Sequence, residues 1–262
     1  MSDAINANEL ILDLLSARET HELSAASLCR AGGWLGISEQ TLRVALTRLV
    51  QQGKINARAR AVYTWNPAGH SLFENVRNWL YKERQMTPWS GNWIGVLDSG
   101  MASSDRASLK NHRKALELRG FKMLRNGLSV RPDNILGGVA QLRQELSALG
   151  LSSRATVIGV SNLAKEDERA ARSLWDTQAL KRSYSESIKR LKRSEKALTR
   201  MSLEEAAAHT LIEGRRVIRD IILDPLLPEE MFASARRYEL IERMKAYQDK
   251  AKIIWLDALE LN

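Results

Sequence analysis

The chain has 262 residues, of which 44% are apolar, and a formal net charge of +9 from 40 basic and 31 acidic residues. This composition excludes wholesale disorder and allows two or three modest cores. Cys29 is the only cysteine, which excludes a disulfide framework within the chain and a thiolate zinc site. The excess of positive charge suits a polyanionic partner such as DNA or an anionic membrane surface.

Several protein classes are disfavoured by patterns that the sequence lacks. The first eight residues do not combine a basic start with an apolar run, so we expect no secretory signal. No apolar stretch is long enough to span a bilayer, and we therefore expect a cytoplasmic protein that makes no membrane contact. The four histidines show no metal-ligand spacing, and no nucleophile elbow or phosphate loop is present. We expect no enzymatic activity, no cofactor and no metal site.

Residues 8–53 have the spacing of three short helices. The first covers Glu9 to Ser16, the second begins near Ser24, a suitable N-cap, and the third begins at Ser38. Gly53 is placed to end the third helix, and two short strands, at 54–57 and 61–65, are predicted to follow as a hairpin. The apolar stripe of the third helix has the i, i+3, i+4, i+7 spacing of an amphipathic helix and consists of Leu42, Ala45, Leu46, Leu49 and Val50.

The central part of the chain has a different periodicity, in which strands and helices alternate. The predicted order is strand, helix, strand, strand, helix, strand, which is the order of the split βαβ or ferredoxin-like fold. Asn126-Gly127 between the middle strands is a strong hairpin signal. The strands are expected at 93–97, 121–124, 128–131 and 155–160, and the helices at 103–119 and 134–149.

From Lys165 onward the pattern is helical throughout, and Asp224-Pro225 and Pro228 separate the last two helices. The helices are expected at 166–176, 178–198, 202–223 and 229–256. We therefore predict an α+β protein in four segments. These are a winged helix-turn-helix DNA-binding domain at 1–66, a linker helix within 67–90, a ferredoxin-like βαββαβ domain at 91–163 and a helical domain at 164–262.

The third N-terminal helix carries groups that suit base recognition. In a winged helix-turn-helix this helix lies in the major groove, where Gln pairs with adenine and Arg with guanine. Between Ser38 and Arg60 there are five basic residues and one acidic residue, and a hairpin with two arginines favours DNA contact over a merely solvated helix face. Arg48 suits either a phosphate contact or an ion pair inside the domain. The candidate DNA-binding residues are Ser38, Gln40, Thr41, Arg43, Thr47, Arg48, Arg58 and Arg60.

Four segments of the chain resemble the PaaX family of transcriptional repressors. Residues 36–50, Gly-Ile-Ser-Glu-Gln-Thr-Leu-Arg-Val-Ala-Leu-Thr-Arg-Leu-Val, resemble the recognition helix of that family. Trp89-Ser90-Gly91-Asn92-Trp93 resembles the entry into its central domain. The segments from Leu116 to Gly127 and from Arg215 to Pro228, the second ending in Asp224-Pro225-Leu226-Leu227-Pro228, are similar to later family segments. The matches follow in order over nearly the whole chain.

The resemblance implies a winged helix, a central domain similar to the Cas2-like fold of CRISPR-associated proteins, and a helical effector and dimerisation domain at 164–262. It implies a homodimer that binds a double-stranded DNA operator and represses a pathway for the degradation of phenylacetate or another aromatic compound. It also implies release from the operator by an aryl-CoA thioester such as phenylacetyl-CoA.

The helical segment carries side chains that suit such an effector. Aromatic rings would stack on the aryl group, and arginines along one side of the next helix would bind phosphate. The alternative is that the rings belong to the core and that Arg219 pairs with a carboxylate such as Asp224. The effector-binding candidates are Trp175, Tyr184, Arg215, Arg216 and Arg219.

Three further interpretations remain open on the sequence alone. Lys181 to Arg200 holds eight basic and two acidic residues, which suits CoA phosphates, DNA or a solvated helix face. Asp98 near the end of the first central strand raises the possibility of a metal-dependent nuclease, although a single Asp is poor evidence and Asp98-Ser99-Gly100 is ordinary turn chemistry. The last is a non-catalytic scaffold whose winged helix binds protein.

Overall fold

The computed structural model describes residues 5–16, 22–58, 60–66, 78–98, 106–233 and 235–260. These residues form a mixed helical and sheet structure with two small antiparallel sheets, which confirms the predicted α+β class. None of the described helices is both long enough and apolar enough to cross a membrane.

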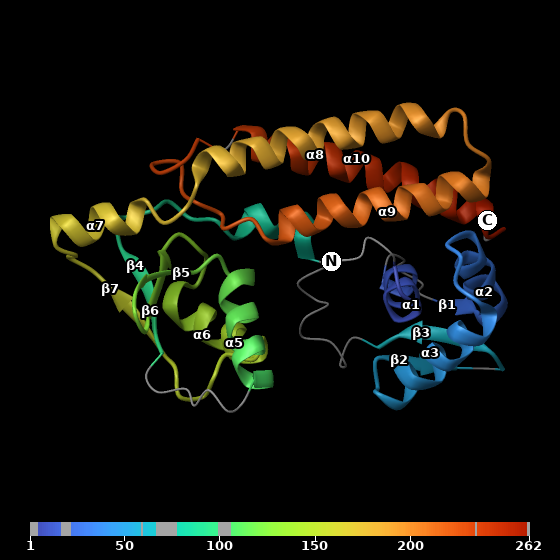
Figure 1. The fold of residues 1–262 in the computed structure, drawn as a ribbon, viewed down its shortest axis with the longest axis horizontal. Coiled ribbons are helices and arrows are strands. Elements are labelled where there is room, and N and C mark those ends of the chain that lie inside the picture. Colours follow the sequence, from blue (N-terminus) through green and yellow to red (C-terminus); the bar gives the residue numbers. More distant parts are fainter. Residues whose placement is uncertain are drawn as a thin grey trace. The chain divides into compact units, whose positions relative to one another are not determined.

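The chain divides into two compact units (Figure 1). The sequence predicts the helices of 164–262 as a domain of their own, whereas the contacts divide these helices between the two units. Unit 1 consists of Met1–Arg77, Ser187–Ile218 and Ile241–Asn262, and unit 2 consists of Asn78–Glu186 and Arg219–Leu240.

The N-terminal part of unit 1 contains three helices and a three-stranded antiparallel sheet. Its elements are α1 (Ala7–Ser16), β1 (Glu22–Ser24), α2 (Ala25–Trp34), α3 (Glu39–Gln51), β2 (Ile55–Ala57) and β3 (Val62–Trp65). The strand order is β1-β3-β2, with Leu23 opposite Tyr63 and Asn56 opposite Thr64. Sequence reasoning missed β1, because a strand of three residues is too short to show a repeated alternation.

The two predicted N-caps begin the helices as expected. The Ser24 hydroxyl accepts a hydrogen bond from the Ser27 amide at 3.0 Å, and the Ser38 hydroxyl accepts one from the Thr41 amide at 3.2 Å. Such caps satisfy amides that have no partner within the helix. They fix where α2 and α3 begin, and hence which side chains of each helix face the shared core.

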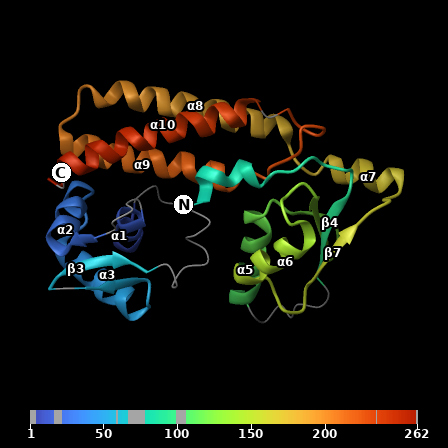
Figure 2. The ribbon, with the colours of Figure 1, turned by 180° about the vertical axis from the view of Figure 1, so that it is seen from behind.

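The C-terminal helices complete the core of unit 1. They are α8 (Thr177–Leu198), α9 (Leu203–Ile222) and α10 (Ala235–Ala258), whose parts in unit 1 lie side by side (Figures 1 and 2). Leu259 is buried in the same cluster as the apolar residues of α1, α2 and α3. Trp255 packs against Trp34 with ring centroids 5.6 Å apart, and Arg30 donates to the Leu259 carbonyl at 3.1 Å. The end of α10 is therefore fastened to α2.

Unit 2 contains a four-stranded antiparallel sheet of order β5-β6-β4-β7. Its elements follow the predicted order and are β4 (Trp93–Leu97), α5 (Arg106–Leu118), β5 (Lys122–Arg125), β6 (Leu128–Pro132), α6 (Gly138–Ala148) and β7 (Thr156–Val160). Ile94 and Val96 point to one face, where they pack with residues of α5 and α6. Trp93 and Val130 point to the other face, where Trp89 and Trp175 cover them. Both faces of the sheet are thus covered.

The segment between α9 and α10 is held by buried polar groups of unit 2. The Lys82 ammonium donates to the carbonyls of Ile221, Ile222 and Asp224 at 2.5–3.2 Å and so caps the C-terminus of α9. Such a cap satisfies carbonyls that the helix leaves without partners. Asn134 donates to the Leu226 carbonyl at 2.8 Å. The Asp-Pro-Leu-Leu-Pro motif is therefore held in place by hydrogen bonds from other segments of unit 2.

Several predicted helices differ in extent from those observed. Of the segment 67–90, in which the linker helix is expected, residues 67–77 lie outside the described residues, and residues 78–85 form the 3-10 helix η2 (Asn78–Gln85). Helix α6 begins four residues late, because Gly137 and Gly138 have left-handed φ values of 78° and 50°. The helix expected at 166–176 is the shorter α7 (Lys165–Arg172), and α10 begins at Ala235 rather than at 229.

The close packing of α2 on α3 depends on a glycine, and we predict opposite effects of alanine at two adjacent positions. A Cβ on Gly32 would lie 2.1 Å from Cδ1 of the fully buried Leu42, whereas a Cβ on Gly33 would meet nothing within 4 Å. We expect Gly32→Ala to lower the free energy of unfolding by about 1–3 kcal/mol through overpacking. Gly33→Ala is expected to raise it by about 0.5–1 kcal/mol because alanine is the better helix former.

Urea unfolding of both variants, followed by circular dichroism, checks this pair. Equal stability of the two variants would show that α2 and α3 do not depend on contact at Gly32.

Candidate nucleic-acid interface

Helix α3 separates its apolar side chains from its polar ones. Leu42, Leu46 and Leu49 are at most 1% exposed and belong to the core shared with α1 and α2. Because the helical repeat places the remaining positions on the opposite side, these face solvent. The predicted DNA-binding residues at this helix and its cap are all exposed: Ser38, Gln40, Thr41, Arg43, Thr47 and Arg48.

The exposed side of α3, which we call the α3 face, consists of Gln40, Arg43, Val44, Thr47 and Gln51. Val44 is 62% exposed at its centre and was not among the predicted site residues. The signal was present in the sequence, since position 44 lies opposite the apolar stripe on a helical projection. A valine methyl in the major groove would suit the methyl group of thymine.

The cation of the α3 face is held by a neighbour on its own helix. Glu39 accepts from Arg43 Nε at 2.8 Å and lies 2.6 Å from Nη2. This contact raises the pKa of the Arg43 guanidinium, which stays charged. The Thr47 hydroxyl donates to the Arg43 carbonyl at 3.1 Å. Both side chains are surface groups whose present partners are local, so a groove of DNA could take over their hydrogen bonds without unfolding the helix.

Arg48 offers a cation beside this face. The sequence left open whether it pairs with an acidic neighbour, and among the described residues it has no carboxylate partner. It is exposed, which leaves it available to a phosphate.

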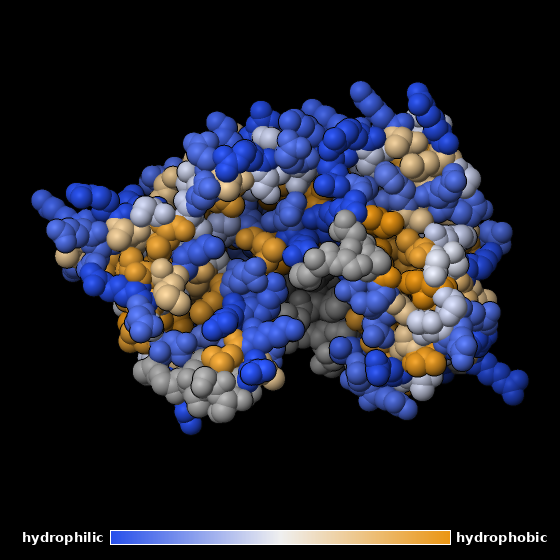
Figure 3. Space-filling view, in the orientation of Figure 1, coloured by the Kyte–Doolittle hydropathy of each residue, from blue (hydrophilic) through white to orange (hydrophobic). Residues whose placement is uncertain are grey.

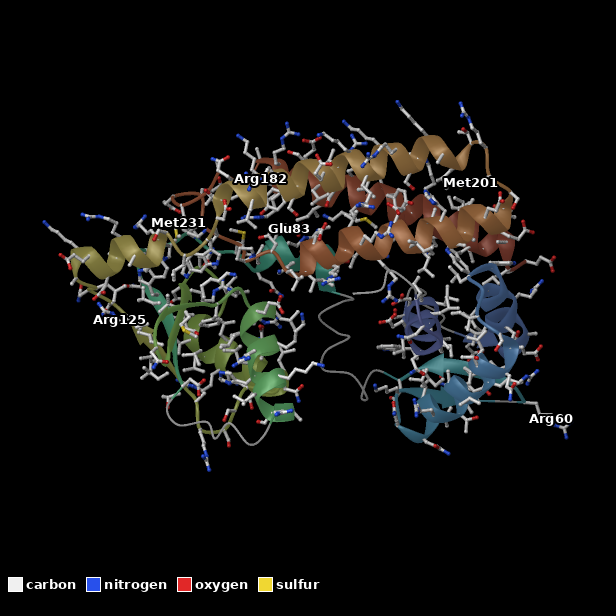
Figure 4. The ribbon with its side chains drawn as sticks, in the orientation of Figure 1. Arg60, Glu83, Arg125, Arg182, Met201 and Met231 are labelled. Carbon is white, nitrogen blue, oxygen red and sulfur yellow. The ribbon has the colours of Figure 1, made fainter. Side chains whose placement is uncertain are left out.

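The β2–β3 hairpin carries two arginines away from the core. Arg58 and Arg60 are both exposed, and Arg60 extends outward from the hairpin end (Figure 4). The Arg58 amide donates to the Val62 carbonyl at 3.0 Å, and Ala61 adopts a left-handed φ of 60°. This backbone closes the hairpin tightly and leaves both guanidinium groups in solvent.

One of the predicted effector residues instead supports unit 1. Arg215 of α9 forms an ion pair with Asp13 of α1 and lies 3.3 Å from Glu9 of the same helix. Burial raises the pKa of Asp13 to about 6, although Arg215 opposes the shift. Arg216, the next candidate, lies 2.5 Å from Glu213 of its own helix. Both arginines therefore have carboxylate partners.

The two predicted aromatic effector residues are core residues of unit 2, which is the alternative that the sequence left open. Trp175 is 5% exposed, stacks on Trp93 with centroids 6.2 Å apart, and donates to the Gly120 carbonyl at 3.3 Å. Tyr184 is 3% exposed. Neither ring offers a free face, so the stacking role expected for them is not supported.

Tyr184 belongs to a buried triad that sequence reasoning did not find. Its hydroxyl binds Asp224, whose carboxylate also lies 3.3 Å from Arg237 Nε. Burial, reinforced by Asp224, raises the pKa of Tyr184. Asp224, which the alternative interpretation offered as one possible partner of Arg219, is paired with Arg237 instead, and Arg219 is exposed. No sequence spacing signals this triad, since its members come from three separate helices and loops.

Asp98 at the end of β4 has a local partner. His112 Nε2 lies 3.3 Å from Asp98 Oδ2, while His112 Nδ1 accepts from the Ser152 amide at 3.3 Å. Residues 99 and 100, on which the turn interpretation rests, lie outside the described residues. Within the described ranges there is no group of three or more His, Cys, Asp or Glu side chains that could hold a metal ion.

Comparisons with known proteins give a relation at the level of the fold. No protein family and no curated protein matches the chain. Among solved structures the chain is similar to the uncharacterized protein Rv0674 from Mycobacterium tuberculosis, with 20% sequence identity and a TM-score of 0.57. The similarity covers 94% of this chain and 99% of that chain, and shows a shared fold.

The raised pKa of Asp13 predicts a pH dependence of stability in unit 1. The pKa of Asp13 is 3.8 in the unfolded chain and about 6 in the folded one, so the protonated carboxyl group favours the folded state. This stabilisation is complete below pH 3.8 and is lost as the pH rises through about 6. The free energy of unfolding should therefore decline over this pH range, and we expect Asp13→Asn to make the decline smaller by about 1–3 kcal/mol, at roughly 1.4 kcal/mol per pKa unit. Urea unfolding at a series of pH values measures it. An unchanged decline in the variant would contradict the assignment to Asp13.

Proposed function

We propose that the chain is a sequence-specific DNA-binding transcriptional repressor that reads its operator with the α3 face. The observation that carries the proposal is the α3 face itself: solvent-exposed side chains of types that can bind base edges, on a helix whose other side is buried in the core. The arginine hairpin in the same unit adds two cations for backbone phosphate.

The element order of unit 1 supports this proposal. Helix, strand, helix, helix and hairpin, with the hairpin and β1 in one sheet, is the arrangement expected of a winged helix-turn-helix. In that fold the helix that corresponds to α3 enters the major groove, and its N-terminal residues reach base edges. Gln40 and Arg43 lie in the first turns of α3, and Gln and Arg are the side chains that pair with adenine and guanine.

Charge favours DNA over protein as the partner of this surface. Helix α3 and the hairpin carry exposed Arg43, Arg48, Arg58 and Arg60, of which only Arg43 has a carboxylate beside it among the described residues. Protein interfaces are generally built around an apolar centre, and Val44 is the only large exposed hydrophobic residue described on α3. The scaffold interpretation is therefore the weaker one.

The architecture of unit 2 and the PaaX resemblance supply the rest of the proposal. The strand order β5-β6-β4-β7 with two helices on one face is the one expected of a ferredoxin-like domain, and it supports the Cas2-like fold that the resemblance implies. The resemblance adds a cytoplasmic homodimer, control of an aromatic degradation pathway and release by an aryl-CoA thioester. The two winged helix-turn-helix domains of such a dimer, related by a two-fold axis, would read half-sites about one helical turn of DNA apart. The effector would act by favouring a dimer that does not fit this spacing.

The α3 face predicts which substitution abolishes sequence preference. The probe is the duplex that the wild-type chain selects from a random pool. We expect Arg43→Ala to weaken binding of this duplex roughly 10- to 100-fold, the equivalent of about 1–3 kcal/mol for one bidentate base contact. Binding of a scrambled duplex should fall much less. Fluorescence anisotropy at constant salt measures both affinities.

Arg106→Ala is the matched control for this variant. Arg106 is an exposed arginine at the start of α5 in unit 2, so its loss changes the net charge equally. Equal weakening by the two variants, or an undiminished preference in Arg43→Ala, would refute base reading by α3.

The hairpin predicts a different signature. Because Arg58 and Arg60 would touch phosphate, replacing both by alanine should weaken binding to selected and scrambled duplexes alike. The slope of log K against log salt should become shallower by about 1–2, since each phosphate contact contributes about 0.9. Titrations at several salt concentrations measure it, and a slope identical to that of the wild type would exclude the hairpin from the contact.

A further inference from the structure

The C-terminal half of α8 presents a row of cations that the proposed operator contact does not use. Exposed basic residues recur at intervals of three or four, which places them along one side of the helix. At 1.5 Å per residue, the part of the row that lies in the helix, from Lys189 to Lys196, extends over about 10 Å. We call the row the α8 stripe, and it consists of Lys189, Lys192, Arg193 and Lys196 of α8 and of Arg200 in the turn that follows the helix.

Within the described part of the chain, most cations of the stripe are not paired with a carboxylate. Glu195 is the only acidic residue between 187 and 200, and it is turned toward α10, 3.7 Å from Arg243 and 3.9 Å from Lys250. Among the described residues, Lys192, Arg193 and Lys196 have no carboxylate partner. The net charge of this surface is therefore strongly positive.

The opposite side of α8 fixes the stripe in place. Leu191 is fully buried, and the Ser194 hydroxyl forms a 2.6 Å hydrogen bond with the buried Tyr247 of α10. Hydrophilic residues cover the outer side of α8 in Figure 3, and Figure 4 shows nitrogen-bearing side chains extending from it into solvent. A helix packed in this way presents its cations at a fixed spacing.

Three kinds of partner can be compared by their chemistry. A protein interface needs an apolar centre, but the exposed side chains of 187–200 are lysines, arginines and Thr199. A membrane-bound amphipathic helix inserts an apolar face, and here that face is already buried in the unit. A nucleic-acid backbone needs only a row of cations, because one phosphate follows another at regular distance.

We propose that the α8 stripe binds the phosphate backbone of duplex DNA without sequence preference, at a surface separate from the α3 face. The proposal rests on the proposed function in that it assigns a second contact with the same ligand. Within unit 1, α3 and α8 lie on opposite sides, with α1, α2 and α9 between them (Figures 1 and 2). The stripe therefore does not extend the operator contact but meets another stretch of DNA, so one chain would join two duplex segments.

The test neutralises three cations of the stripe in the full-length chain. Lys192→Gln, Arg193→Gln and Lys196→Gln are combined, which keeps good helix formers at exposed positions. The matched control combines Arg106→Gln, Lys110→Gln and Arg113→Gln on α5, which removes the same charge from exposed positions of unit 2. Circular dichroism and thermal unfolding establish that both variants are folded.

Two measurements separate the outcomes. Anisotropy titrations with a scrambled fluorescent duplex should give the stripe variant a salt slope shallower by about 2–3, at 0.9 for each lost phosphate contact, and leave the α5 variant close to wild type. In a bridging assay, wild-type protein bound to an immobilised selected duplex should capture the scrambled duplex from solution. The stripe variant should bind the selected duplex but lose this capture at least 10-fold.

Equal slopes for the stripe variant and the wild type, or capture that persists in the stripe variant, would overturn the proposal. So would a stripe variant that loses binding only to phosphatidylserine vesicles. If instead the proposed function is wrong, the results differ from those above. The random pool then yields no preferred sequence and Arg43→Ala does not change DNA binding, while the stripe variant still changes binding to scrambled DNA.

Discussion

The burial of one side of α3 is the constraint on which the proposed DNA contact depends. Leu42, Leu46 and Leu49 enter the core, so the helix cannot rotate without exposing them. At about 25 cal/mol per Å² of apolar surface, each buried leucine disfavours such a rotation by roughly 1.5–3 kcal/mol. The opposite side chains are therefore presented to solvent in one fixed order, which is what recognition of successive base pairs needs.

The same core connects the N-terminal helices α1, α2 and α3 to the C-terminal helices of unit 1. Leu259 is buried among residues of the three N-terminal helices, and Arg215 joins α9 to α1 through Asp13. A movement of α9 or α10 within unit 1 would therefore also displace α1 and α2, which pack against α3. In a repressor this is a physical route by which the C-terminal helices would influence DNA binding.

Unit 2 is organised by a different kind of interaction, a buried network of charges around the Asp224 motif. Arg237 pairs with Asp224 and donates to the Leu227 carbonyl, and Arg131 is 2% exposed nearby. Burial lowers the pKa of Lys82 to about 7 and that of Arg131 to about 10. Removing a member of such a network would leave buried groups without partners, which costs more than losing a surface ion pair.

Whether a structural feature can be predicted from the sequence depends on how far apart along the chain its interacting residues lie. The apolar stripe of α3, its cap at Ser38 and the hairpin at Gly127 are local patterns, and the structure has them where they were expected. β1 exists only because it pairs with β3, about 40 residues away along the chain, which no local pattern shows. The same holds for Tyr184, Asp224 and Arg237: each is unremarkable in sequence, and only the fold joins them. Residue type alone makes Trp175 and Tyr184 candidates for effector binding, but tertiary packing buries both of them in the core.

The central claim, that the α3 face lies in a groove of DNA, is tested most directly by cross-linking from its centre. A photoreactive side chain placed at position 44, where Val44 is 62% exposed, would be irradiated with a duplex pool of random sequence. The same side chain at Ser153, an exposed position in unit 2, is the reference. The account predicts a covalent protein–DNA adduct from position 44 that a folded Arg43→Ala background reduces, and little adduct from position 153. Adducts of equal yield from both positions, or none from position 44, would contradict it.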